Sequence, residues 1–297
     1  MPYVTTDVVI GGAAIKQVVS TSTRTGAVVR NAKYSGGAVI QQMYGVKLEQ
    51  VSTIVSTDVG GLVALNTSTF VSAGLPLLSS TITVPFKNRA NGDTFQASTN
   101  HSQITGSNAL IIPTSIEAQQ DSEQGATATV EVHWISADGV TSAYTGSAGV
   151  AIASEAINVE YALGPADING TDIASVTGIR VNPGLTLVKT SQAGGIMPVE
   201  VSIQMIEPTI DLTVHDIDEV IALTDAFTAL SSFECYLRKR SDGGVYVADA
   251  TAEHIKFSFA DGIIQADTIE SPETGNGSTT IRLYGETLTA SAASAIT

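Results

Sequence analysis

The histidines and the single cysteine are the side chains in this sequence best suited to chemistry. The histidines are His101, His133, His215 and His254, and none of them forms an HExxH motif or a paired-His metal spacing. Cys235 lies in a strand-like run, 233–237, without a histidine or asparagine pattern that would mark it as a nucleophile. We therefore expect these residues to be structural.

One stretch of oxygen-bearing side chains could ligate a cation. Residues 167–172 read Asp-Ile-Asn-Gly-Thr-Asp, a spacing similar to part of a calcium loop, but no glutamate closes the loop. The chain also lacks a P-loop, a G-x-S-x-G motif and a dinucleotide fingerprint. The sequence therefore predicts a non-enzymatic protein without a metal site or cofactor.

The charge of the chain argues against nucleic-acid recognition. Of the 297 residues, 14 are Lys or Arg and 29 are Asp or Glu, a formal net charge of -15. Specific DNA or RNA binding requires a basic surface, and the densest basic cluster, residues 238–240, is better explained as a solvated strand end. No apolar run approaches the roughly 18 residues of a membrane-spanning helix, and the N-terminus does not resemble a signal peptide.

The two halves of the sequence resemble each other. A shift of 158 residues aligns identical residues in order, among them Tyr3 with Tyr161, Gly26 with Gly184, Glu49 with Glu207, and Asp58 with Asp216. Downstream the shift becomes 153 residues and aligns His101 with His254. We predict a first domain over 1–145, a linker or added strand over 146–159, and a second domain over 160–297.

The clearest elements lie in the second repeat. Apolar residues alternate with polar ones over 199–205, and the alternation resumes in the opposite parity over 210–214, which predicts a strand pair with a bend at Pro208. Asp216 and Glu219 resemble a capping box before a helix over 217–230. The matching helix after Asp58 contains Gly60 and Gly61, so we expect it to be weaker or shorter.

Short strands separated by Gly, Asp and Asn turns follow each predicted helix. The expected fold is mainly β, with two tandem homologous β-sandwich domains, each carrying one flanking α-helix and a long hairpin. Duplication of a self-associating domain would place like units at neighbouring positions of a ring, so that three chains make a pseudo-sixfold ring and two a pseudo-fourfold one.

This arrangement resembles the tail tube protein of long-tailed bacteriophages and related viruses, in its duplicated-domain form. The segments that carry the resemblance are 199–214, 216–230, 233–239 and 278–285, with counterparts at 41–55, 58–70, 81–87 and 126–134. The resemblance implies a virion protein, made in the host cytoplasm, that assembles with itself into stacked, pseudo-hexameric and trimeric rings. Its other partners would be tail or virion proteins and DNA in transit through the channel, with no membrane.

A tube of this kind should let DNA slide without binding it, which an acidic surface favours. The candidate channel-lining side chains lie on two strand faces of the second repeat: Glu200, Ser202 and Gln204 on one, and Asp211, Thr213 and His215 on the other. Three alternatives remain: a capsid decoration or head–tail connector protein, a duplicated β-sandwich binding module, and an enzyme that depends on His101 or His254.

Overall fold

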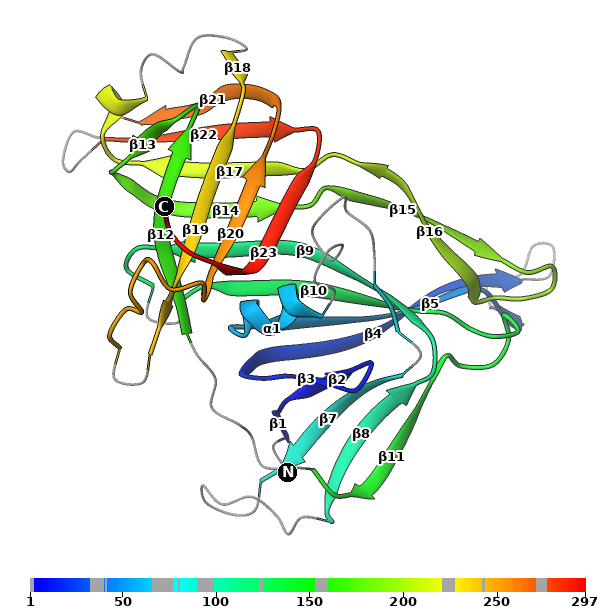
Figure 1. Cartoon of the computed structure of the whole chain (residues 1–297). Coiled ribbons are helices and arrows are strands. Elements are labelled where there is room, and N and C mark those ends of the chain that lie inside the picture. Colours follow the sequence, from blue (N-terminus) through cyan, green and yellow to red (C-terminus); the bar gives the residue numbers. More distant parts are fainter. Residues whose placement is uncertain are drawn as a thin grey trace.

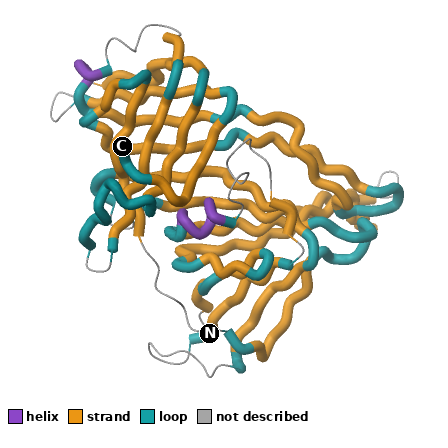
Figure 2. The backbone as a smooth tube through the Cα atoms, viewed as in Figure 1, coloured by secondary structure: helices purple, strands orange, loops and turns teal. Residues whose placement is uncertain are grey.

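The computed structural model describes residues 3–32, 40, 42–65, 77–79, 81–89, 99–122, 125–152, 160–220, 228–241, 244–270 and 277–297. The described chain is mainly β-structure, arranged in antiparallel sheets (Figures 1 and 2). We call residues 3–150 the first half and residues 160–297 the second half.

The first half runs through these elements: β1 (Tyr3–Thr5), β2 (Val8–Ile10), β3 (Ala13–Ile15), β4 (Val18–Ala32), β5 (Gln42–Ser56), α1 (Val59–Ala64), β6 (Leu77–Ser79), β7 (Ile82–Asn88), β8 (His101–Gly106), β9 (Ala109–Gln119), β10 (Thr127–Trp134) and β11 (Tyr144–Val150). Strand β11 pairs with β8 of the same chain. Residues 146–150 of the predicted linker region therefore belong to this strand, while 153–159 lies outside the described residues.

The second half contains these elements: β12 (Glu160–Ile168), β13 (Thr171–Ile173), β14 (Val176–Asn182), β15 (Leu185–Ser191), β16 (Pro198–Ile206), β17 (Thr209–Val214), the short 3-10 helix η2 (Ile217–Glu219), β18 (Thr228–Leu230), β19 (Phe233–Arg240), β20 (His254–Phe259), β21 (Gly262–Glu270), β22 (Ser278–Gly285) and β23 (Leu288–Ser294). The C-terminus follows β23 and lies in the upper body of the molecule in Figure 1.

A ten-stranded sheet crosses both halves. Its order is β18-β21-β22-β17-β14-β9-β10-β5-β4, with β6 beside β9, and the halves meet where β14 pairs with β9. A six-stranded sheet, β11-β8-β7-β2-β3 with β1 beside β7, packs on the first-half part. A five-stranded sheet, β13-β12-β19-β20-β23, packs on the second-half part. The remaining sheet is the hairpin β15–β16.

Strict alternation explains why these strands form and which faces they bury. In β17, Ile210, Leu212 and Val214 are fully buried, while Asp211 and Thr213 between them are half-buried on the outer face. Successive side chains of a strand point to opposite faces, so one face enters the core. Buried apolar residues from both halves form one continuous cluster, because the ten-stranded sheet passes through both.

The predicted bend at Pro208 is confirmed. Strand β16 ends at Ile206 and β17 begins at Thr209, and the buried parity changes from Val201 to Ile210. On the partner strand, Gly184 has a φ of 64°, and its carbonyl accepts a hydrogen bond from Glu207 N at 3.0 Å. The second-half hairpin is therefore broken at its base, whereas β4 and β5 run unbroken for 15 residues each.

The helix predicted for the second half is wrong at its C-terminal end. In the second half, Thr228–Leu230 is strand β18, paired with β21, and Ile217–Glu219 at the other end forms the 3-10 helix η2. Glu219 does not complete a capping box, because it accepts hydrogen bonds from Ser175 N and Oγ at 3.1 and 2.8 Å. Pairing with β21 overrides the local helical pattern at 228–230, while residues 221–227 lie outside the described residues.

In the first half, the helix predicted after Asp58 is present as α1. Asp58 caps it, accepting from Gly61 N at 2.9 Å and from Lys16 N at 3.0 Å. A Cβ on Gly60 would lie 2.5 Å from Tyr161 Oη, so glycine permits close packing against the second half. The predicted extension of this helix over 66–70 lies outside the described residues.

Candidate assembly surface

The two matched histidines have the same structural role. His101 and His254 are buried, and their Nδ1 atoms accept hydrogen bonds from Asn88 N and Lys239 N, each at 3.1 Å. A ring nitrogen that accepts from a backbone N–H holds two neighbouring strands together. This geometry gives no support to a catalytic role for either histidine.

The other candidate chemical groups are also engaged in structure. Cys235 is buried, and burial raises the pKa of its thiol well above the usual range, which disfavours the nucleophilic thiolate. In the calcium-like stretch, Asp167 Oδ1 accepts from Gly170 N at 2.8 Å, and Asn169 Oδ1 accepts from Ser231 N at 2.7 Å. These oxygens close a turn and anchor it to the loop after β18.

Hairpin β4–β5, which we call the first arm, extends away from the body (Figure 1). Strand β10 pairs with β5 only over 51–56, and residues 42–47 beyond that point are exposed. Large apolar side chains lie on this exposed part: Val28 (54%), Val29 (51%), Met43 (65%), Tyr44 (48%) and Val46 (51%). Such a concentration of exposed apolar area is typical of an interaction surface.

Hairpin β15–β16, the second arm, projects in the same direction, and its tip rests on the first half (Figure 1). Leu48 N donates to Ile196 O at 2.7 Å, and Ser136 N donates to Pro198 O at 2.9 Å. Ile196 N and Met197 N both donate to Gly139 O. Backbone hydrogen bonds thus join the second arm to β5 and to the loop after β10.

An apolar cluster lies beneath the second arm. Val201 of β16 is buried with Leu110, Ile112 and Ile135 of the first half, and the partly buried Leu185 and Leu187 of β15 pack against them. Burial of apolar area contributes about 25 cal/mol per Å². The second arm is therefore held on the first half by packing as well as by backbone hydrogen bonds.

A group of charges surrounds the same junction. Lys189 Nζ of β15 lies 3.0 Å from Glu49 Oε2 of β5, and Lys47 Nζ lies 2.6 Å from Glu49 Oε1. His133 Nε2 of β10 lies 3.0 Å from Glu131 Oε2. Burial lowers the pKa of His133 below its ordinary value, and Lys189 lowers it further, against the opposite effect of Glu131.

The candidate channel-lining residues are divided between the arm and the body. Glu200, Ser202 and Gln204 are exposed on one face of the second arm. Asp211 and Thr213 lie instead in the ten-stranded sheet of the body, where Asp211 Oδ1 is 2.6 Å from Arg282 Nε. Sequence reasoning did not single out the apolar surface of the first arm, although Met43, Tyr44 and Val46 lie close together in the sequence.

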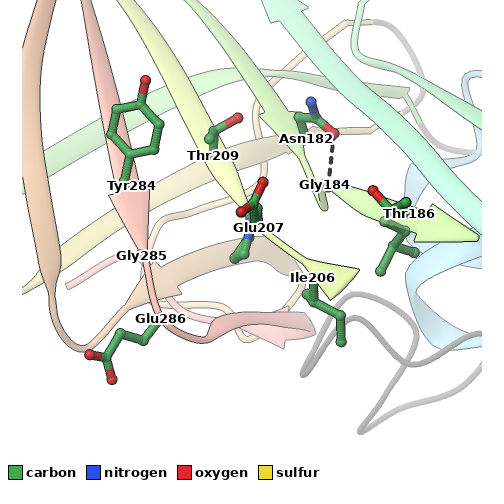
Figure 3. Close-up of a pocket in the computed structure, with 11 residues that line it drawn as sticks. Asn182, Gly184, Thr186, Ile206, Glu207, Thr209, Tyr284, Gly285 and Glu286 are labelled. Carbon is green, nitrogen blue, oxygen red and sulfur yellow. Dashed lines mark hydrogen bonds between the residues drawn. The ribbon is translucent and has the colours of Figure 1, made fainter. Parts of the chain in front are cut away.

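An open cleft of 660 Å³ lies at the base of the second arm, between the arm and the body sheet (Figure 3). Residues that line it are Asn182, Gly184, Leu185, Thr186, Ile206, Glu207, Pro208, Thr209, Tyr284, Gly285 and Glu286. Asn182 Oδ1 accepts from Gly184 N at 2.9 Å and closes the turn at its edge. The lining carries two carboxylates, Glu207 and Glu286, and contains no cysteine, serine or histidine.

Comparison with known proteins leaves the chain without an assigned family. No family model matches it, and no curated protein matches it. Within the described residues, no group of three or more His, Cys, Asp or Glu side chains could hold a metal ion. No helix in the described part of the chain is long and apolar enough to cross a membrane.

Proposed function

We propose that the chain is a tandem duplication of one β-sandwich domain. The strand order β11-β8-β7-β2-β3 in the first half has the counterpart β23-β20-β19-β12-β13 in the second. The order β6-β9-β10-β5-β4 likewise has the counterpart β18-β21-β22-β17-β14. Matching strand orders in two sheets, together with the aligned sequence repeat, are the main support for this proposal.

Irregularities in the sheets support it further, because a β-bulge is a specific local feature rather than a general property of sheets. The register of β4 on β5 shifts between Val18 and Ser20, and that of β14 on β17 shifts between Val176 and Gly178. A second pair of matching shifts lies at Val28/Val29 and Thr186/Leu187. A third lies between β9 and β10 and between β21 and β22.

A reciprocal exchange of aromatic residues also supports the duplication. In the first half, a Cβ on Gly106 would overlap the ring of Trp134. In the second half, a Cβ on Gly285 would overlap the ring of Phe259. Gly106 aligns with Phe259 and Trp134 with Gly285, so each half fills the same core space with one aromatic ring, supplied from opposite sheets.

We further propose that the protein assembles with itself into stacked rings that form a hollow tube for DNA, as in a viral tail. The observation that carries this proposal is the joining of two like halves inside one chain by β14–β9 pairing and arm docking. This junction is head-to-tail, and a head-to-tail contact repeats until it closes a ring or continues as a helix. Three chains would supply six similar units.

In this proposal the exposed face of the second arm, with Glu200, Ser202 and Gln204, lines the channel. The position of Asp211 and Thr213 in the body sheet makes them the less suitable candidates. A net charge of -15 favours a channel wall that repels phosphate, so that DNA moves through it without binding.

Negative-stain electron microscopy of the purified protein, with mass photometry over a concentration series, tests the assembly. We expect hollow rods of stacked rings, or soluble closed rings at low concentration. A protein that stays monomeric at every concentration would contradict self-assembly. It would favour a decoration or binding module that requires a different partner.

A further inference from the structure

The surface of the first half on which the second arm docks has an equivalent surface in the second half, where neither arm of the same chain docks. The second arm covers Leu110, Ile135 and Glu49 in the first half. By the alignment of the halves, the corresponding residues of the second half are Ile263, Glu286 and Glu207. These lie at or beside the 660 Å³ cleft, because Glu207 and Glu286 line it and Ile263 pairs with the lining residue Tyr284.

The first arm has the side chains that such a cleft would receive. Met43 corresponds to Val201, and Val29 corresponds to Leu187. Val201 is only 8% exposed, and Leu187 is partly buried against the same cluster. In contrast, Met43 is 65% exposed and Val29 is 51% exposed, so these two side chains face solvent.

The apolar area around the cleft is exposed as well. Ile206 (36%), Tyr284 (40%) and Ile263 (43%) lie at or beside the cleft, and Ile269 (52%) lies at the other end of β21, paired with Thr279. Ile116, which corresponds to Ile269, is only 2% exposed in the core cluster and pairs with Val181 across the β9–β14 junction. The exposed first arm and the exposed cleft region of the second half thus correspond to the second arm and the first-half surface that it covers.

We propose that the cleft at the base of the second arm receives the first arm of a second copy of this chain. The first arm then lies across β21 and β22 as the second arm lies across β9 and β10, with Met43 of the incoming copy against Ile263. In the same register Asn31 occupies the position of Lys189 and faces Glu207. An amide–carboxylate contact between Asn31 and Glu207 then replaces the Lys189–Glu49 ion pair. This inference rests on the proposed self-assembly and specifies its interface.

The cleft is more polar than its counterpart, which suits a surface that is exposed before assembly. Glu286 stands where the first half has Ile135, and Gln265 stands where it has Ile112. Exposing a less apolar surface to water costs less free energy, so the single chain is less destabilised before a second copy binds.

Disulfide cross-linking between two variants, each with one added cysteine, tests the interface. Met43→Cys and Ile263→Cys chains are purified separately, mixed, and oxidised; the native Cys235 is buried and serves as an internal background. We expect a covalent dimer in the mixture and none above background in either variant alone, because a head-to-tail contact joins two different surfaces. Val245→Cys, at a site 67% exposed and away from both surfaces, is the matched control for Ile263→Cys.

Met43→Asp tests the same contact by its effect on assembly, with Val245→Asp as its control. We expect Met43→Asp to raise the concentration needed for assembly at least tenfold, while Val245→Asp assembles like the wild type. Assembled particles without the Met43–Ile263 cross-link, or normal assembly of Met43→Asp, would overturn this interface but leave the tube proposal standing. A chain that never assembles would overturn both, so the two failures are distinguishable.

Discussion

Trp134 illustrates how a single residue specifies the packing between the two sheets of the first half. Its ring is buried, its Nε1 donates to Ser52 Oγ at 2.9 Å, and it contacts Tyr144 edge-on at 5.5 Å between ring centroids. The ring also fills the space above Gly106, so that a side chain at position 106 would have to displace the ring. The core is therefore sensitive to added volume at this glycine.

Gly106→Ala should destabilise the protein by about 1–3 kcal/mol, because the added methyl group overlaps the Trp134 ring and the core must shift. Gly146→Ala on the neighbouring strand β11 meets nothing within 4 Å and should leave stability nearly unchanged. Urea denaturation followed by the fluorescence of the only tryptophan, Trp134, measures both. Equal stability of the two variants would contradict this account of the core.

His133 makes the junction beneath the second arm sensitive to acid. Burial and Lys189 lower its pKa in the folded protein below the ordinary histidine value of about 6.5, so the unfolded chain binds the proton more tightly. Stability should therefore fall as the pH drops through about 6.5, and level off below the folded-state pKa. The facing groups are Glu131 on β10, Glu49 on β5 and Lys189 on β15.

His133→Gln should remove this part of the pH dependence. The free energy of unfolding, measured by urea denaturation between about pH 5 and 8, should fall less steeply toward acid in the variant than in the wild type. His215→Gln is the control, because His215 is exposed. Parallel pH profiles for wild type and His133→Gln would show that the burial of His133 is not coupled to stability.

At the scale of elements, the two arms differ in how they leave the body. Gly184 has a φ of 64° and lies so close to Glu207 that a Cβ would overlap the Glu207 carbonyl. Gly26, at the corresponding place in the unbroken strand β4, would bring a Cβ to an ordinary 3.8 Å from Glu49 O. The break in the second arm thus requires glycine, whereas the continuous first arm does not.

Gly184→Ala should therefore destabilise the protein by about 1–3 kcal/mol, through both the backbone strain and the overlap. Gly26→Ala should be neutral or slightly stabilising, since an alanine fits a strand at that position without a clash. Thermal unfolding of the two variants in parallel tests the difference. A neutral Gly184→Ala would mean that the base of the second arm relaxes readily.

At the scale of the whole molecule, the acidic net charge predicts weak interaction with DNA. Replacing Glu200, Ser202 and Gln204 together with lysine should create a salt-dependent DNA-binding surface. If this face lines a channel, DNA loaded during assembly should be protected from nuclease in the particles.

Lysines at Thr145, Ser147 and Ala148 on β11, which are also exposed in the single chain, provide the matched control. DNA bound through them should remain sensitive to nuclease. Equal nuclease sensitivity in both variants would place Glu200, Ser202 and Gln204 outside the channel.

The strands and turns could be predicted from the sequence because they depend on local patterns. Alternation over 199–205 and 210–214 identified two strands and the break at Pro208, which the structure confirms. Strand β18, at the end of the predicted helix, could not be predicted in this way, because its pairing with β21 is a contact between residues distant in sequence.

The candidate assembly surface could not be predicted from local patterns, because it depends on contacts between residues that are distant in sequence. We predicted two domains in tandem, but the sequence did not reveal that β14 pairs with β9 and that one core runs through both halves. The exposure of Met43 and the burial of its counterpart Val201 follow from that junction, since only one of the two arms finds a body to dock on within the chain. Local periodicity specifies which side chains share a strand face; whether that face meets protein or solvent depends on how the sheets come together.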